Sequence, residues 1–318
     1  MTDHAGEGAT AEADAEANAE ADTEGSPDAE LDAKIEAARA DLAGFDGVLV
    51  AFSGGVDSSV VAALAHDALG ADAVACTARS ETLPEAELED ARRVAEEVGI
   101  RHETVTFSEL DDPEFVLNGD DRCYHCRTMR LGKMFEKARE LGIGVVCDGT
   151  NASDPGEGHR PGLRAVAEMD AYSPLLEHGF TKEEVREAAR RYDLSVADKP
   201  SMACLSSRIP TGVEVTEARL SRVERAERLL REWGFEQFRV RDHDGLARIE
   251  VGTAELERAL DPAFAEAAEH HLTDVGFDHV TLDLGGYETG SVSPAGEAAD
   301  ETADVDAILG AEYPSAED

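Results

Sequence analysis

Short apolar runs alternate with longer amphipathic segments over the first two thirds of the chain. The apolar runs are rich in Val and Ala and too short for helices, so each predicts a buried strand. The expected strands cover residues 47–52, 72–78, 101–107 and 144–150. Helical periodicity is expected over residues 31–45, 57–70, 84–99, 122–141 and 181–192. Strands that alternate with helices predict an α/β fold, in which a parallel sheet carries helices on both faces.

Local end signals support three of these helices. Pro84 is expected at the start of one helix, because its fixed φ suits the first turn. Gly70 is expected to end another. Thr181 and Glu184 have the spacing of a capping box, which predicts a helix that begins directly after Thr181.

The pattern changes after Pro210. A helix, two strands joined by a tight turn, a second helix and a last strand are expected in that order. Their ranges are 216–233, 237–243, 246–251, 261–275 and 279–284. This order predicts a small α+β domain over residues 211–293, beside a larger domain over residues 29–210.

Both ends of the chain have the composition of disordered tails. Residues 1–28 contain no Lys or Arg and almost no large apolar side chain, and residues 294–318 are similarly acidic. Such segments cannot bury enough apolar surface to offset the entropy lost on ordering. We therefore expect tails at residues 1–28 and 294–318.

The net charge of the 318-residue chain is −41, with 70 acidic and 29 basic residues. Such an acidic, lysine-poor composition is typical of a halophile, and it argues against a nucleic-acid surface, which needs clustered positive charge. No apolar run has the length of a membrane span. Five cysteines, an odd number, argue against a secreted disulfide framework. The sequence therefore predicts a cytoplasmic protein that binds neither membrane nor nucleic acid.

The stretch "SGGVDSS" lies between an expected strand and an expected helix. Its glycines allow close approach of an anion, its serines offer hydroxyls, and the helix N-terminus supplies oriented N–H groups. A plain glycine turn is the alternative, and the pattern is neither Walker A nor GxGxxG. It resembles the pyrophosphate loop of the PP-loop ATPases, which cleave ATP between the α- and β-phosphates. The resemblance implies an ATP site formed by Ser53, Gly54, Gly55, Asp57, Ser58 and Ser59, with Mg²⁺ at Asp57.

Polar residues follow the fourth expected strand, at the sheet edge where α/β proteins gather ligands. Asn151 is a candidate nucleotide ligand, and Asp154 lies beside it; both are also common in simple turns. Cys76 and Cys147 lie inside apolar strand runs, which favours buried and inert thiols.

Cys123 and Cys126 form a CxxC pair at the start of an expected helix. A zinc site would need a second ligand pair, which the sequence lacks. A redox pair and a coincidental pair stay open. Cys204 lies in a polar loop near Lys199 and Arg208, and nearby cations lower the pKa of a thiol. Three cysteines can hold a [4Fe–4S] cluster and leave one iron open.

Several segments together resemble the LarE-type ATP-dependent sacrificial sulfur transferases of the PP-loop superfamily. They are "SGGVDSS", "DRCYHCR", "DGTNASD", "RPGLRAVAEM", "DKPSMACLSSRIPTG" and "RVRDH…ARIEV", and the likeness covers residues 30–293. The resemblance implies a Rossmann-like PP-loop fold, ATP and Mg²⁺ as requirements, and a homohexamer.

The implied substrate is a pyridinium dicarboxylate mononucleotide, a precursor of the nickel-pincer nucleotide. A carboxylate would be adenylated and AMP then displaced by sulfur. In single-cysteine members the thiolate at the position of Cys204 gives up its sulfur and becomes dehydroalanine. The additional Cys123 and Cys126 match the three-cysteine members, for which the resemblance implies a [4Fe–4S] cluster on all three.

The resemblance also places substrate contacts in the C-terminal part. Arg239 and Arg241 alternate along an expected strand and therefore project to one face, where they suit a phosphate clamp or a plain charge stripe. The other expected contacts are Ser206, Ser207 and Arg208 for substrate, and Glu227 and Glu250 for metal or substrate.

Three other functions remain open at this point. A PP-loop tRNA thiolase uses similar cysteines but would need a basic surface. An amidating enzyme such as NAD or GMP synthase would not need the cysteines. A nucleotide-binding or iron–sulfur sensor would bind ATP without cleaving it.

Overall fold

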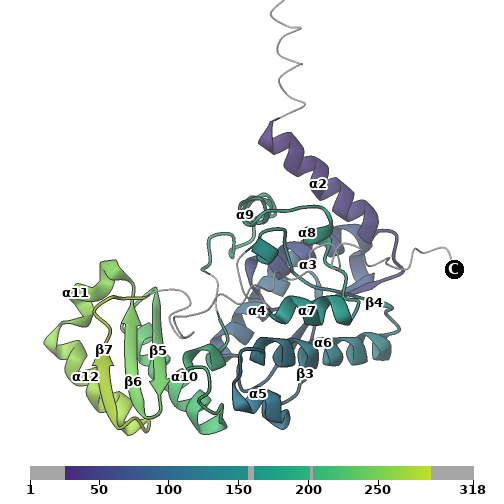
Figure 1. Cartoon of the computed structure of the whole chain (residues 1–318). Helices are drawn as coiled ribbons and strands as arrows, with labels where there is room; N and C mark the ends of the chain where they lie inside the picture. The colour runs from purple at the N-terminus through teal and green to yellow at the C-terminus, as the bar shows by residue number, and fades with distance from the viewer. Residues whose placement is uncertain (1–25, 157–160, 201–202, 288–318) are drawn as a thin grey trace, which may run out of the picture.

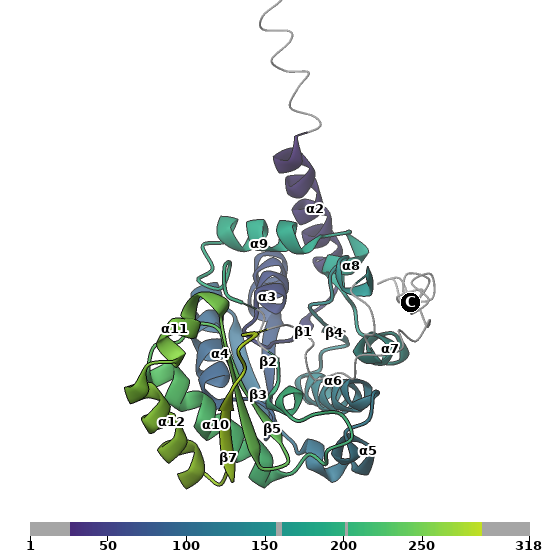
Figure 2. The same ribbon diagram turned by 60° about the vertical axis from the view of Figure 1, so that its left-hand side comes forward.

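The computed structural model describes residues 26–156, 161–200 and 203–287. These residues form two units that lie side by side (Figures 1 and 2). The expected tails at residues 1–28 and 294–318 lie outside the described residues, apart from residues 26–28.

The first unit contains the predicted parallel sheet. Its strands are β1 (Val48–Ala51), β2 (Ala73–Arg79), β3 (Arg101–Thr106) and β4 (Val145–Cys147). All pairings are parallel, and the order across the sheet is β3-β2-β1-β4. The helices of this unit are α2 (Pro27–Leu42), α3 (Val56–Leu69), α4 (Glu85–Val98), α5 (Pro113–Leu117), α6 (Arg122–Leu141), α7 (Pro161–Glu168), α8 (Pro174–Glu177) and α9 (Lys182–Arg191).

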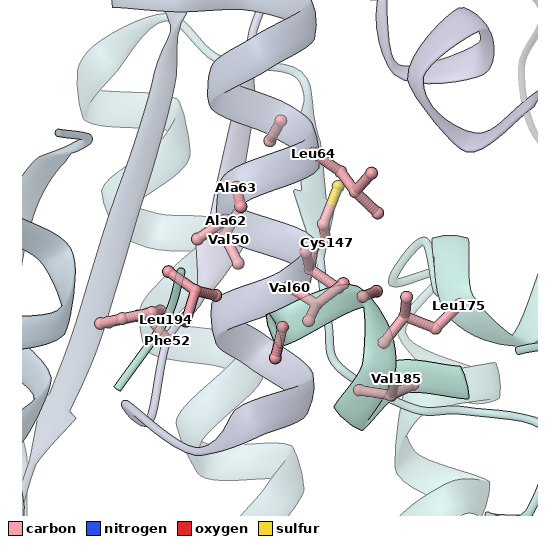
Figure 3. Close-up of a cluster of buried hydrophobic side chains, with 14 of the residues drawn as sticks. Val50, Phe52, Val60, Ala62, Ala63, Leu64, Cys147, Leu175, Val185 and Leu194 are labelled. Carbon is pink, nitrogen blue, oxygen red and sulfur yellow. The ribbon is translucent and has the colours of Figure 1, made fainter. Parts of the chain in front are cut away.

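Side-chain alternation along the strands builds a core on each face of the sheet. Val48 and Val50 point to the face covered by α2, α3, α4 and α9, and Leu49 points to the opposite face, covered by α6 and α7. Figure 3 shows part of the first core, with Val50, Val60 and Cys147 in one cluster. The prediction of an α/β fold with helices on both faces is therefore confirmed.

In the first unit, the ends of the predicted helices lie within one residue of their expected positions, except in α2. The capping box of Thr181 and Glu184 is present at the start of α9. The N-cap of α4 is Pro84, so that helix begins one residue later than expected. The helix α2 begins four residues earlier than expected, because the Ser26 hydroxyl accepts from the Ala29 N–H and Pro27 suits the first turn. The first tail therefore cannot extend to residue 28.

The second unit has its own sheet and its own core. Its strands are β5 (Phe238–His243), β6 (Leu246–Val251) and β7 (His279–Leu282), and its helices are α10 (Glu217–Glu232), α11 (Leu256–Ala259) and α12 (Pro262–Asp274). The strands β5 and β6 are antiparallel, and β7 runs parallel to β6. Phe115 of α5, and Leu205 and Ile209 of the segment before α10, join this core, so apolar contacts hold the two units together.

Short 3-10 turns complete the described structure, at η1 (Gly70–Asp72), η2 (Glu109–Asp111), η3 (Asp154–Gly156), η4 (Leu205–Arg208) and η5 (Thr253–Glu255). Of the helices described, none combines the length and the apolar character that crossing a membrane requires.

Candidate functional site

The phosphate loop joins β1 to α3 in a geometry that only glycine permits at one position. Gly54 has φ +71°, and a Cβ there would lie 2.7 Å from the Ala91 Cα in α4. Gly55 is the N-cap of α3. The Ser58 and Ser59 hydroxyls both donate to the Gly55 carbonyl, at 3.2 Å and 2.8 Å. The loop is thus fixed internally, and the N–H groups of the first turn of α3 form a site for an anion.

Asp57, in the first turn of α3, is held by two partners. Its carboxylate accepts from the Lys182 Nζ, at 2.8 Å and 2.6 Å for its two oxygens, and from the Asn151 side-chain amide at 3.0 Å. Sequence reasoning named Asp57 and Asn151 but missed Lys182, which is one of only five lysines in the chain. The sequence alone gives no signal for Lys182, because its partner Asp57 lies 125 residues away.

Two adjoining cavities lie at this edge of the sheet, with volumes of about 180 Å³ and about 530 Å³. The smaller contains the phosphate loop, Thr82, Glu87 and Lys199 in its wall. The larger contains Asn151 and the three cysteines named from the sequence. Five residues line both cavities, namely Ser53, Asp57, Arg130, Lys182 and Cys204.

The walls of these cavities reverse the charge balance of the chain. Acidic residues outnumber basic ones more than twofold in the whole sequence, 70 against 29. The cationic lining residues are Arg122, Arg127, Arg130, Lys182, Arg186 and Lys199, and the acidic ones are Asp57, Glu87 and Asp154. A locally positive cavity in a strongly negative protein attracts an anionic ligand.

Two elements bring the three thiols to the larger cavity. Cys123 and Cys126 lie in the first turns of α6, where Arg122 and Arg130 are each four residues from Cys126 and share its face. Cys204 is the N-cap of η4. That turn is fixed by a hydrogen bond from the Leu205 N–H to the Thr82 carbonyl at 2.9 Å.

The environments of the thiols set their pKa values apart. Burial opposes ionisation of Cys204, but the charge of Arg122 and a contact with the Ser206 hydroxyl outweigh it, so the pKa of Cys204 lies below its usual value. Burial raises the pKa of Cys126 to about 12. Burial likewise raises the pKa of Cys76 to about 12 and that of Cys147 also, in agreement with two inert thiols. Cys204 is therefore the better nucleophile.

This difference predicts an order of alkylation in protein prepared without metal. At pH 7 we expect iodoacetamide to modify Cys204 much faster than Cys126, because the thiolate is the reacting form. The sign follows from the shifts: a lowered pKa gives Cys204 more thiolate than an ordinary thiol below its usual pKa, whereas Cys126 stays protonated until the pH approaches 12. Peptide mass spectrometry against time measures both rates, and equal rates would contradict the prediction.

The residues that were expected to bind substrate or metal in the C-terminal part form two buried ion pairs. These pairs lie beside the segment that carries Cys204, residues 203–208, which we call the sulfur loop. Arg208 donates to both Glu227 oxygens, at 2.8 Å and 3.0 Å. Arg241 donates to Glu250 and also to the Ser207 carbonyl, at 2.9 Å in each case. Ion pairing with arginine therefore occupies the two glutamates that were expected to bind metal or substrate.

Arg239 and Arg241 share one face of β5, as their alternation predicts. Arg239 lies against the Tyr287 ring, 5.1 Å from its centroid, and donates to the Phe238 carbonyl at 2.7 Å. Ser207 donates its hydroxyl to the Cys204 carbonyl at 2.7 Å, which ties it to the sulfur loop. Within the part of the chain that the structure describes, no three or more His, Cys, Asp or Glu side chains are grouped to hold a single metal ion.

Comparison with known proteins gives one match to part of the first unit and other matches over most of the chain. A family model described as NAD synthase matches residues 34–117, which include the phosphate loop and end before Cys123. An uncharacterized protein from Synechocystis sp. is 41% identical over 248 residues, which is 78% of this chain and 92% of that protein. Pyridinium-3,5-bisthiocarboxylic acid mononucleotide synthase from Lactiplantibacillus plantarum is 37% identical over 77% of this chain and 88% of its own length.

The chain belongs to the LarE family. It is therefore an ATP-using sulfur transferase, which sets aside the alternative of a sensor without turnover. A tRNA-specific 2-thiouridylase from Geobacter metallireducens is also similar, at 32% identity, but over only 48% of this chain and 52% of that enzyme. The LarE likeness extends over both units, whereas the thiouridylase likeness covers half the chain.

Proposed function

We propose that this LarE-type enzyme uses ATP to adenylate a carboxylate of a pyridinium dicarboxylate mononucleotide and then replaces the activated oxygen with sulfur. The product would be a thiocarboxylate in the biosynthesis of the nickel-pincer nucleotide. The observation that carries the proposal is the pair of adjoining cavities, one with the phosphate loop and the other with three thiols. The similarity to the Lactiplantibacillus synthase along most of both chains supports the choice of substrate.

The first step uses the phosphate loop. The N–H groups at the start of α3, with Mg²⁺ at Asp57, would hold the pyrophosphate part of ATP. A substrate carboxylate oxygen attacks the α-phosphorus, the bond from that phosphorus to the pyrophosphate oxygen breaks, and an acyl-adenylate forms. In the second step sulfur attacks the acyl carbon and the C–O bond to AMP breaks.

The sulfur-bearing residues fit a [4Fe–4S] cluster. Cys123, Cys126 and Cys204 line the same cavity, and three cysteine ligands leave one iron free. Arg122 and Arg130 line that cavity too and offset the charge of the thiolates. When bound, such a cluster supplies an exchangeable sulfide, which would spare the Cys204 side chain.

The lowered pKa of Cys204 favours a second source of sulfur. Its thiolate would attack the acyl-adenylate directly and expel AMP. Loss of the Cα proton to a base and cleavage of the Cβ–S bond would then release the thiocarboxylate. Cys204 would be left as dehydroalanine, and each protein molecule would act once.

The second unit would hold the substrate's phosphate. Arg241 contacts the Ser207 carbonyl from β5, Arg239 lies two residues before it on the same strand, and guanidinium groups suit phosphate oxygens. Ser207 and Arg208 adjoin them, and Glu227 and Glu250 position the arginines and stay candidates for a metal or substrate contact. High-salt adaptation and a homohexamer stay predictions of the sequence.

One experiment tests the function and separates the two sulfur sources. The protein is incubated anaerobically with ATP, Mg²⁺ and the pyridinium dicarboxylate mononucleotide, with and without reconstitution by iron and sulfide. The masses of the small molecules and of the intact protein are then measured by mass spectrometry. We expect pyrophosphate, AMP and thiocarboxylate, with catalytic turnover only after reconstitution and no turnover in the Cys123→Ala/Cys126→Ala double variant.

Two other outcomes are informative. Loss of the mass of H₂S from Cys204, at one product per chain, would replace the cluster version with the sacrificial one. Absence of both pyrophosphate and thiocarboxylate with this substrate would contradict the proposed function. If tRNA replaced the pyridinium substrate in the same mixture and received sulfur, that result would favour the thiouridylase alternative.

A further inference from the structure

In the proposed reaction, the atoms that change bonds would lie at the boundary between the two cavities. AMP transfer places the α-phosphorus where the nucleotide site meets the acceptor site, because both the pyrophosphate and the attacking carboxylate must reach it. Only two cations line both cavities among the described residues, Lys182 and Arg130. Lys182 donates to both oxygens of Asp57, which directs two of its three N–H donors to that carboxylate. Arg130 has five N–H donors, so we consider it as the residue that could bind a further anion.

Arg130 is held along one edge of its guanidinium group. Its Nε and Nη2 donate to the same Glu109 oxygen, at 3.2 Å and 3.0 Å, and Nη2 also donates to the Thr82 hydroxyl at 2.8 Å. Among the residues that the structure describes, Nη1 has no hydrogen-bond partner. The side chain is also partly exposed, at 25%. One edge is therefore anchored and the other is available to a ligand in the cavities.

The anchor is built from fully buried groups. Glu109 and Thr82 are both 0% exposed, and the Thr82 hydroxyl donates to Glu109 at 2.9 Å. A buried ion pair adds little net stability compared with a well-packed apolar pair. Its location at the boundary of two cavities is better explained by the need to hold a guanidinium group in one position.

We propose that Arg130 is a catalytic residue that binds the α-phosphoryl group, first in ATP and then in the acyl-adenylate, and that Glu109 and Thr82 are its positioning residues. The inference rests on the proposed function, in which AMP is the transferred and then the leaving group. Arg130 makes and breaks no covalent bond. Its Nη1 group donates to a phosphoryl oxygen, where it stabilises the charge that develops as pyrophosphate leaves and later as AMP leaves.

AMP binding tests the inference without any acceptor. We expect Arg130→Gln to weaken AMP binding roughly 10- to 100-fold, as the loss of a charge-assisted hydrogen bond does, and to leave adenosine binding unchanged. Arg139→Gln is the matched control, because it removes the same charge from an exposed position on the same helix. Glu109→Gln keeps the size of the anchor, and we expect a smaller loss of AMP affinity. Thermal unfolding of each variant reports on folding.

Calorimetric titration separates the outcomes. AMP affinity that is unchanged in Arg130→Gln overturns the inference, as does a wild-type protein that does not bind AMP. An equal loss of AMP and adenosine binding also overturns it, because Arg130 would then shape the pocket only. Failure of the wild type to release pyrophosphate with the pyridinium substrate is a separate result, which concerns the proposed function and leaves the AMP comparison valid.

Discussion

Replacement of Cys204 by Ala is expected to reduce thiocarboxylate formation by on the order of 10³-fold or more while pyrophosphate release stays within about threefold of the wild type. The reason is that the two chemical steps use different groups. In the proposed reaction, adenylation would need the phosphate loop and the substrate carboxylate, whereas sulfur transfer would need the thiol at the N-cap of η4. The expectation is the same for both proposed sulfur sources, because Cys204 would be a cluster ligand in one and the sulfur donor in the other.

Cys76→Ala is the matched control for Cys204→Ala. It removes the same sulfur atom from a fully buried position in β2, outside the walls of both cavities. We expect it to keep thiocarboxylate formation, with a modest loss of stability from the small cavity that it leaves. Pyrophosphate and thiocarboxylate are measured in the same reaction mixture. Wild-type yields of thiocarboxylate from Cys204→Ala would show that the sulfur does not pass through this residue.

Local patterns in the sequence were enough to predict the first unit. The strand–helix alternation gave a parallel sheet because parallel strands require crossover connections, and those crossovers are the helices. The outward and inward alternation at Val48, Leu49 and Val50 then fixed a core on each face. Three short helices, α5, α7 and α8, were not predicted, because segments of four to eight residues show too little periodicity. The other errors lie at element ends, where a single cap such as Ser26 moves the boundary by a turn.

The candidate site was predictable only where its residues lie within a recognisable motif. The phosphate loop and the CxxC pair each lie in one short segment, so their residues could be named. Lys182 is 125 residues from Asp57, and Arg130 is 21 residues from Glu109, so each pairing depends on how the chain folds. Charged side chains at such separations carry no pattern that distinguishes a site residue from a surface residue.

In the second unit, the sequence predicted which side chains share a face of the sheet, but not which of them form an ion pair. Strand alternation predicted that Arg239 and Arg241 share a face, and they do. It did not predict that Glu250 on β6 would bind Arg241 rather than Arg239, although Glu250 is opposite Arg239 in the register. A diagonal pair of this kind depends on side-chain length and on the neighbouring Ser207 carbonyl, which also accepts from Arg241.

Asp57→Asn is expected to lower pyrophosphate release by on the order of 10³-fold and to raise the Mg²⁺ concentration needed for half-maximal rate. Asparagine keeps the size of the side chain, and its carbonyl oxygen can still accept from Lys182 and Asn151, so the loop geometry is retained. The negative charge is lost, and a neutral amide binds a hard cation such as Mg²⁺ less strongly than a carboxylate does.

Asp67→Asn gives the comparison, because Asp67 is on the same helix, is exposed, and accepts from the Tyr192 hydroxyl far from the phosphate loop. We expect this variant to keep the wild-type rate and the wild-type Mg²⁺ dependence. Rates of pyrophosphate release measured across a Mg²⁺ series distinguish the two substitutions. If Asp57→Asn matched the wild type at low Mg²⁺, Asp57 would not be a metal ligand, and the contact with Lys182 would be its whole role. Partial recovery of the rate at high Mg²⁺ would instead show that the carboxylate acts through the metal, because a weakened ion site is filled by mass action.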